Sequence, residues 1–222
     1  MKYFVGGDHN MGRFIPMDNK SWVVLEKNAI EIVNDEVLEL KNTMPNERDQ
    51  WEMMGKSGFV PRIQKLFGEF PYSYSNHKMV PDPVTPRLVV RCLEYARAHF
   101  SKFEWNGALV NLYVDGADGI GMHSDDEPEL NKEAPILSFS FGATRRFLVV
   151  ANKKHSAAVK KRLTLDLEHG DLVVMGGNLQ EGFKHSIPKT KKPVAWRLNI
   201  TIRSLLEINR AKKPRLIEVE EE

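Results

Sequence analysis

The chain has one cysteine, Cys92, among its 222 residues. A single thiol excludes an internal disulfide framework and a thiolate metal cluster, so a bound metal must be held by histidine and carboxylate side chains. Cys92 falls in a stretch with helical periodicity, where we expect it to act as a small buried hydrophobic residue.

Long apolar runs are also missing. No stretch approaches the roughly 18 consecutive apolar residues of a membrane-spanning helix, and the first residues, MKYFVGGDHNMGR, contain no continuous apolar segment. Because a secretory signal needs such a segment, we expect an intracellular protein with no membrane partner, nuclear if the source is eukaryotic and cytoplasmic if it is bacterial. No feature indicates a dimer, and we expect a monomer.

Neither sign of charge dominates, since the formal net charge is +2. With 41% hydrophobic and 28% charged residues, the composition is that of an ordinary globular domain with a sizeable core. The basic residues are nevertheless grouped, between Lys153 and Arg162, between Lys184 and Lys192, and between Arg210 and Arg215. Such groups are often solvated loops, but they are also typical of a surface that neutralises phosphates. From charge alone, a nucleic-acid partner and plain solvated loops are equally supported.

Three segments precede the main strand region. Residues 1–50 predict an N-terminal extension with a short strand near Trp22 and a helix within 29–40. Residues 51–84 are rich in aromatics, glycine and proline, which indicates loops and short strands and suggests a recognition flap. A helix should follow, with Thr85 as its cap and Pro86 in the first helical position, ending near Phe100.

Between Trp105 and Leu206 the chain becomes a succession of strand-like pieces, such as PILSFSFG, DLVVMG and RLNITIR, separated by glycine and charged turns. Many short strands without intervening helices predict a jelly roll. The predicted fold is therefore α+β, mainly β, with a jelly-roll core and its preceding helix in residues 85–207. Residues 208–222 read as a charged tail.

Candidate metal ligands lie in the stretch NLYVDGADGIGMHSDDE, residues 111–127. His123 and Asp125 are two apart, so in a strand their side chains leave the same face. His185 is the candidate third ligand, because jelly-roll strands bring distant segments side by side. Two histidines and one carboxylate are typical of non-haem iron(II) oxygenases, and zinc is the competing metal. An isolated H-x-D motif is more often a surface histidine in a turn.

The strand RLNITIR, residues 197–203, favours iron. Its polar and aliphatic residues alternate, so the polar ones share a face: Arg197, Asn199, Thr201 and Arg203. A desolvated guanidinium needs an anion and pairs bidentately with a carboxylate. Asn111 and Tyr113, also two apart, can donate further hydrogen bonds. A dicarboxylate beside an open iron site indicates 2-oxoglutarate as cosubstrate.

This ordered set of motifs resembles the AlkB family of iron(II)- and 2-oxoglutarate-dependent nucleic-acid dealkylases. The motifs are N-x-Y at 111–113, H-x-D-D-E at 123–127, H-S-x-P at 185–188 and R-x-N-x-T-x-R at 197–203. The resemblance continues through PILSFSFGATRRF and HGDLVVMGG and covers roughly residues 50–207. It implies a double-stranded β-helix core, with Fe(II) as cofactor and 2-oxoglutarate and O2 as cosubstrates.

The resemblance also implies roles for individual residues. His123, Asp125 and His185 would bind iron, and Arg197 would pair with the distal carboxylate of 2-oxoglutarate. The remaining cosubstrate residues would be Asn111, Tyr113, Asn199 and Arg203. Asp126 and Glu127 match an acidic pair that lies near the target base in this family.

The flap resembles the branch of the family that repairs duplex DNA. In MMGKSGFVPR, Met54 stands where that branch has an intercalating aromatic residue, and apolar side chains can wedge between base steps. Tyr72 and Tyr74 match a base-holding pair. The alternative is that they are strand tyrosines packed on a core.

The activity implied is oxidative demethylation of 1-methyladenine and 3-methylcytosine in DNA, with release of formaldehyde, succinate and CO2. Basic loops around Lys153–Arg162 and Lys189–Lys192 would hold the phosphates. Alternatives are demethylation of RNA, another 2-oxoglutarate-dependent hydroxylation, and a non-catalytic jelly roll that binds nucleic acid.

Overall fold

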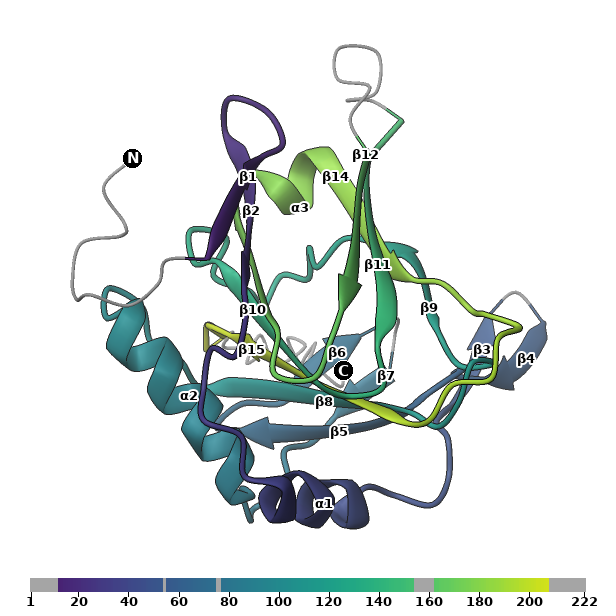
Figure 1. Ribbon diagram of the computed structural model, residues 1–222. Coiled ribbons are helices and arrows are strands. Elements are labelled where there is room, and N and C mark those ends of the chain that lie inside the picture. The colour runs from purple at the N-terminus through teal and green to yellow at the C-terminus, as the bar shows by residue number, and fades with distance from the viewer. Residues whose placement is uncertain (1–11, 54, 75–76, 154–161, 208–222) are drawn as a thin grey trace, which may run out of the picture.

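The computed structural model of the chain describes residues 12–53, 55–74, 77–153 and 162–207. Two antiparallel sheets form its body (Figure 1). The strands of the larger sheet are, in spatial order, β1 (Arg13–Pro16), β2 (Ser21–Glu26), β13 (Leu172–Gly177), β10 (Ile136–Gly142), β15 (Arg197–Arg203), β8 (Gly107–Tyr113) and β5 (Ile63–Gly68). Those of the smaller sheet are β12 (Arg162–Leu167), β11 (Arg145–Ala151), β14 (Phe183–Ile187) and β9 (Ile120–His123). The sheets face each other, which confirms the predicted jelly roll.

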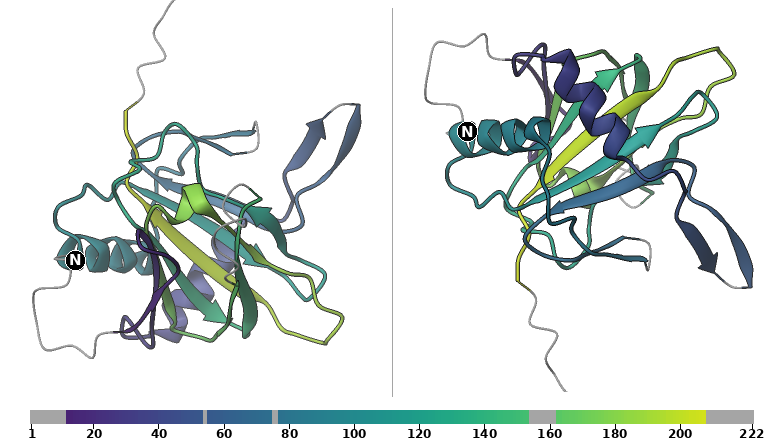
Figure 2. Two further views of the ribbon diagram at one scale, coloured as in Figure 1. Left: turned by 90° about the horizontal axis from the view of Figure 1, so that it is seen from above. Right: turned by 90° about the horizontal axis from the view of Figure 1, so that it is seen from below.

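A core lies on each face of the larger sheet. On the outer face, helices α1 (Asn34–Thr43) and α2 (Arg87–His99) cover the strands, as Figure 2 shows. Cys92 of α2 is fully buried there, as predicted. On the inner face, side chains of both sheets pack together, with Val173 and Met175 against Phe147 and Phe183. One-turn helix α3 (Leu179–Gly182) connects β13 to β14.

Strand β15 separates the two sides. Its aliphatic residues Leu198, Ile200 and Ile202 belong to the helix-covered core, so the alternating polar residues point between the sheets. All seven residues of β15 are buried. The polar face that the alternation predicts is therefore enclosed, and its groups must find partners inside the protein or on a ligand.

Helix α2 begins one residue later than the sequence predicts. Pro86 is the N-cap, with extended dihedral angles of φ −62° and ψ 150°, and no side chain caps the helix. The prediction that Thr85 caps and Pro86 opens the helix was therefore wrong. Because Pro86 already supplies the carbonyl oxygen that accepts from the Val90 N–H, Thr85 lies outside the helix.

The segment predicted as a flap divides into two hairpins and one core strand. The hairpins are β3 (Gln50–Met53) with β4 (Lys56–Phe59), and β6 (Tyr72–Tyr74) with β7 (His77–Met79). Between them, β5 is an edge strand of the larger sheet and pairs with β8, because Ile63 and Phe67 are buried against the helix-covered core. Residues 63–68 are thus core rather than flap.

The N-terminal segment likewise contributes to the core. Strand β2, predicted near Trp22, pairs with β13 and places Val23 and Val24 in the two cores. Helix α1 (Asn34–Thr43) overlaps the range 29–40 expected for a helix and ends three residues beyond it. Residues 13–26 therefore extend the larger sheet, and the predicted segment boundaries themselves stay a prediction.

Candidate active site

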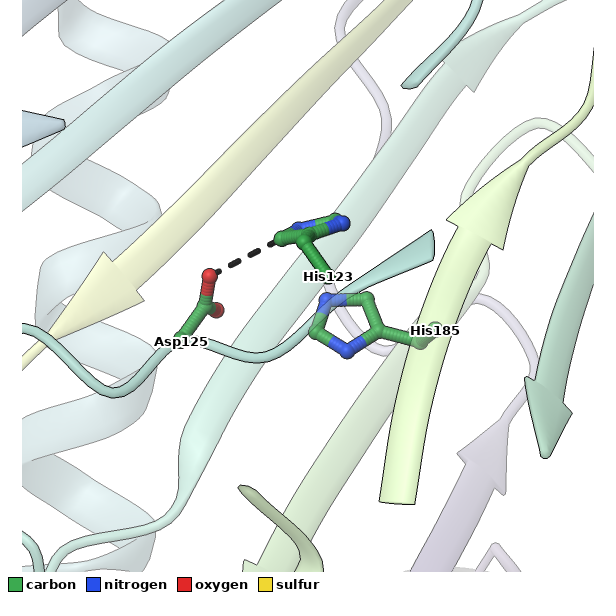
Figure 3. Close-up of side chains that lie close together, drawn as sticks. All are labelled: His123, Asp125 and His185. Atoms are coloured by element: carbon green, nitrogen blue, oxygen red, sulfur yellow. Dashed lines mark ion pairs between the residues drawn. The ribbon is translucent and has the colours of Figure 1, made fainter. Parts of the chain in front are cut away.

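Three candidate metal ligands converge between the sheets. His123 at the end of β9 is the direct partner of His185 on β14, and residues opposite each other in antiparallel strands share a face. Asp125 follows His123 by two residues. One ligand atom from each residue lies within 4.8 Å of the others, and the Nε2 of His123 is 3.7 Å from the Oδ1 of Asp125 (Figure 3).

The charges of these groups suit a divalent cation. Burial lowers the pKa of His123. Burial, and the repulsion that would arise if His123 were also protonated, lower the pKa of His185 to about 3, so both rings favour the neutral form. Burial alone would raise the pKa of Asp125, but Arg203, His185 and His123 outweigh it and hold that pKa at about 2. The site therefore offers two imidazole lone pairs and one carboxylate, and Asp125 Oδ1 is buried with no hydrogen-bond partner in the described structure.

Neighbouring groups orient the ligands. The Nδ1 of His123 lies 2.9 Å from the carbonyl oxygen of Gly121, so as the N–H tautomer it donates there and turns the Nε2 lone pair to the side of the other two ligands. The backbone N–H of Asp125 donates to Gln180 Oε1 at 3.0 Å, and the Ser124 hydroxyl donates to the carbonyl oxygen of Phe183 at 2.9 Å. The turn that carries Asp125 is thus fastened to the α3–β14 segment that carries His185.

Arg197 is the described residue best suited to bind an anion. It is 1% exposed, and its Nη2 donates to Ser140 Oγ at 2.9 Å, while Nε and Nη1 are buried without a partner in the part of the chain that the structure describes. Burial lowers its pKa, and nearby Arg145 lowers it further. Its guanidinium lies 5.2 Å from the centre of the Tyr113 ring. Unpaired buried guanidinium N–H groups suit a ligand carboxylate.

Arg203, at the far end of β15, lies on the metal side of the pocket. Its Nη2 donates to Asp125 Oδ2 at 3.2 Å, and its guanidinium lies 5.2 Å from the Tyr72 ring centre. Its Nε and Nη1 have no partner among the described residues. Arg203 therefore holds the carboxylate ligand and retains donors for a second group.

A polar row crosses the sheet between the two arginines. Asn111 and Asn199 are cross-strand partners, with Asn111 Nδ2 donating to Asn199 Oδ1 at 3.4 Å. Arg62 Nε and Gln64 Nε2 both donate to Asn111 Oδ1, at 2.9 and 3.1 Å. The side-chain oxygen of Asn111 is thus occupied by protein donors.

Sequence reasoning missed Arg62 and Gln64, because both were assigned to the flap. Their spacing of two, alternating with buried Ile63, is the signal that could have placed them on one face of a strand. Ser138 and Ser140 of β10 were also missed, and they accept from Asn199 and Arg197.

One cavity joins the predicted metal and cosubstrate residues. Those that line it are Asn111, Tyr113, His123, Asp125, His185, Arg197, Asn199 and Arg203. Its apolar wall includes Phe147 and Met175. The structure therefore brings together residues that are up to 92 positions apart (203 minus 111).

The predicted base-contacting residues differ in how far they are buried. The Tyr72 ring is 1% exposed and packs with Leu109 and Leu130, which fits the alternative of a strand tyrosine on a core. Asp126 is exposed and Glu127 is partly buried. Burial and the charge of Asp125 raise the pKa of Glu127.

Two further predicted contacts cannot be placed. Met54 and the side chain of Tyr74 lie outside the described residues. Contact of any of these residues with a base stays a prediction.

Of the predicted basic loops, Lys189, Lys191 and Lys192 are exposed between β14 and β15, and Lys153 is exposed after β11. Residues 154–161 lie outside the described structure. Among the described helices, none is long and apolar enough to cross a membrane.

The chain matches the family model of the 2OG-Fe(II) oxygenase superfamily over residues 25–203. It is 36% identical over 163 residues to the human DNA oxidative demethylase ALKBH2, which covers 70% of this chain and 60% of that protein. It is 34% identical over 149 residues to human alpha-ketoglutarate-dependent dioxygenase alkB homolog 3, covering 65% and 52%. The chain thus spans little more than half the length of these relatives. The solved structure of OsALKBH1 shares the fold, with a TM-score of 0.58 at 20% identity, covering 86% of this chain and all of that one.

The chain therefore belongs to the 2OG-Fe(II) oxygenase superfamily, whose cofactor is Fe(II) and whose cosubstrates are 2-oxoglutarate and O2. The ligand set and the unpaired guanidinium of Arg197 fit those groups. Within the superfamily the relatives place it in the AlkB family, as the motifs predicted.

Proposed function

We propose that the protein demethylates N-alkylated bases in DNA, with 1-methyladenine and 3-methylcytosine as substrates and formaldehyde, succinate and CO2 as further products. The observation that carries the proposal is the pairing of a His-Asp-His site with a fully buried arginine that has no acidic partner in the described structure. A metal site alone is compatible with hydrolysis, whereas the adjacent anion-binding group supports 2-oxoglutarate chemistry.

In this proposal His123, Asp125 and His185 hold the iron. Fe(II), when bound, supplies the oxidising chemistry that couples decarboxylation of 2-oxoglutarate to hydroxylation of the N-methyl group. Arg197 holds the distal carboxylate through its free Nε and Nη1. The cosubstrate pocket is completed by Asn111, Tyr113, Asn199 and Arg203.

The protein's own residues then select and orient the base. Methylation at N1 of adenine or N3 of cytosine leaves a positive charge, which the carboxylates of Asp126 and Glu127 would attract. Tyr72 and Tyr74 would line the base site, and Met54 would fill the space that the flipped base leaves in the DNA duplex. Flipping costs about a few kcal/mol and is cheapest for a base whose pairing is already broken.

The choice of DNA rests on the relatives, of which human ALKBH2 is named a DNA oxidative demethylase. Exposed lysines at 189, 191 and 192 supply positive charge for the phosphates.

The test is to incubate the protein with Fe(II), ascorbate, 2-oxoglutarate and matched DNA and RNA oligonucleotides carrying either lesion, and to measure demethylated base, formaldehyde and succinate. Demethylation of the DNA is expected, in step with succinate. Turnover confined to RNA would change the substrate class from DNA to RNA. Succinate without demethylation of any oligonucleotide would refute a nucleic-acid substrate. His123→Ala should abolish all three products.

A further inference from the structure

The β3–β4 hairpin pairs with no other described strand and projects from the body, so something else must fix its direction (Figures 1 and 2). Its two ends reach the same short loop. On one side, the Arg48 guanidinium forms a two-pronged ion pair with Asp118, through Nη1 to Oδ1 and through Nη2 to Oδ2 at 3.2 Å. On the other, the carbonyl oxygen of Pro61 accepts the Gly119 N–H at 2.9 Å.

That loop, residues 114–119, leads from β8 directly into β9 and His123. Asp118 is buried, with 2% of its side chain exposed, and its Oδ2 also accepts the Val114 N–H at 2.8 Å. Because the carboxylate holds the loop with one contact and the hairpin with the other, the hairpin and the metal-binding strand share one anchor.

The loop carrying Lys189, Lys191 and Lys192 is fastened to the same place. Buried Arg145 donates to the carbonyl oxygens of Asp115, Asp118 and Pro188, at 2.9, 2.7 and 2.9 Å. The Thr190 N–H donates to the carbonyl oxygen of Gly116 at 2.8 Å.

The two backbones meet without room for side chains. A Cβ at Gly116 would lie 2.5 Å from the Thr190 oxygen, and one at Gly119 would lie 2.7 Å from the Ile187 oxygen. The basic loop and loop 114–119 therefore cannot separate without breaking this packing.

We propose that loop 114–119 is a joint that sets the spacing of the β3–β4 hairpin and the basic loop relative to the metal-binding strand, and that the Arg48–Asp118 ion pair is a positioning element for nucleic-acid binding. The inference deepens the proposed function and rests on it for the identity of the ligand. Arg48 acts through the hairpin, whereas the metal and cosubstrate pockets do not depend on it.

The direct test compares hydrogen exchange of the amides in residues 50–59 between the wild type and Arg48→Ala. Faster exchange in the hairpin, with β9 and β14 unchanged, is expected. Arg146→Ala is the matched control, because Arg146 is exposed and paired only loosely with Asp166 at 3.6 Å. Unchanged exchange in the hairpin of Arg48→Ala would overturn the proposal, and this readout needs no turnover.

The functional arm measures KM for a methylated oligonucleotide and for 2-oxoglutarate. Arg48→Ala should raise the oligonucleotide KM about tenfold, the effect of about 1.4 kcal/mol, and leave the 2-oxoglutarate KM unchanged. An equal rise in both, or in neither, would contradict a positioning role. If the wild type demethylates no oligonucleotide, the proposed function fails. Hydrogen exchange, together with oligonucleotide affinity measured by fluorescence anisotropy, would then still test whether loop 114–119 positions the hairpin.

The variant Asp118→Asn distinguishes the positioning role of the ion pair from a direct contact between Arg48 and phosphate. This change removes negative charge, so it would strengthen phosphate binding if Arg48 simply touched the nucleic acid. The joint predicts weaker binding by Asp118→Asn, because the hairpin loses its anchor. For Arg48→Ala it predicts a salt dependence like that of the wild type, whereas loss of a direct phosphate contact would reduce the slope by about one. Stronger binding by Asp118→Asn would overturn the proposal.

Discussion

Replacing Arg197 with methionine should separate ligand binding from stability. The side chain is buried, keeps one hydrogen bond to Ser140 and leaves Nε and Nη1 without a partner in the described structure. An unpaired buried charge is costly, and an apolar residue of similar volume in its place is often neutral or stabilising. The free energy of unfolding of the unliganded Arg197→Met protein should therefore fall by no more than about 1 kcal/mol, the small cost of the lost hydrogen bond to Ser140.

Binding of 2-oxoglutarate should change far more. Removing one partner of a buried, hydrogen-bonded charge pair costs roughly 2–5 kcal/mol, which corresponds to a loss of affinity of roughly 30-fold to several thousand-fold. A ligand at 100 times its Kd stabilises the folded state by about 2.7 kcal/mol. For a chain of this size that shift is about 5–11 °C in Tm, and in the variant it should fall to about a third of that or less.

The assay is thermal unfolding with Mn(II), which cannot turn over, with and without 2-oxoglutarate. Arg146→Met is the control, because the Arg146 side chain is exposed and does not line the cavity. A full ligand-induced shift in Arg197→Met would refute the assignment of the anion clamp. A large drop in Tm without ligand would refute the view that the arginine is unsatisfied in the free protein.

Four other outcomes are expected. Asp125→Ala should lose Mn(II) binding by calorimetry, whereas Asp166→Ala, an exposed control, should retain it; binding by the first would remove Asp125 from the metal site. Gln180→Leu should weaken Mn(II) binding about tenfold, because the Gln180 side chain holds the backbone of the Asp125 ligand in place, and Gln180→Glu should restore the binding. In the metal-free protein the pKa of His185 is lowered from 6.5 to about 3. The neutral ring therefore contributes fully to stability above pH 6.5, and the free energy of unfolding falls as the pH drops, by about 2 kcal/mol at pH 5. Urea unfolding of His185→Gln should show a weaker dependence of this free energy on pH. Met54→Ala should impair demethylation of duplex more than of single strands, and equal loss would exclude a wedge.

Local spacing was enough to predict much of the candidate site. The alternation in residues 197–203 places Arg197 and Arg203 on one face of any strand. The strand argument does not account for Asp125, because β9 ends at His123 and Asp125 lies in the segment that follows. Spacing of two was equally present in Arg62 and Gln64, but their glycine- and proline-rich surroundings suggested a flap. Burial of Ile63 and Phe67, a tertiary effect, made β5 a core strand instead.

The sequence by itself determined the chemical types of the groups and the faces from which they project, because these follow from residue identity and the two-residue period of a strand. It also carried the motifs that place the chain in its family. Only the tertiary structure decided that His185 pairs with His123, that Arg197 lacks an acidic partner among the described residues, and that the hairpin and the basic loop meet at Asp118. These depend on strand register and on contacts between residues far apart in the chain, which no local pattern encodes.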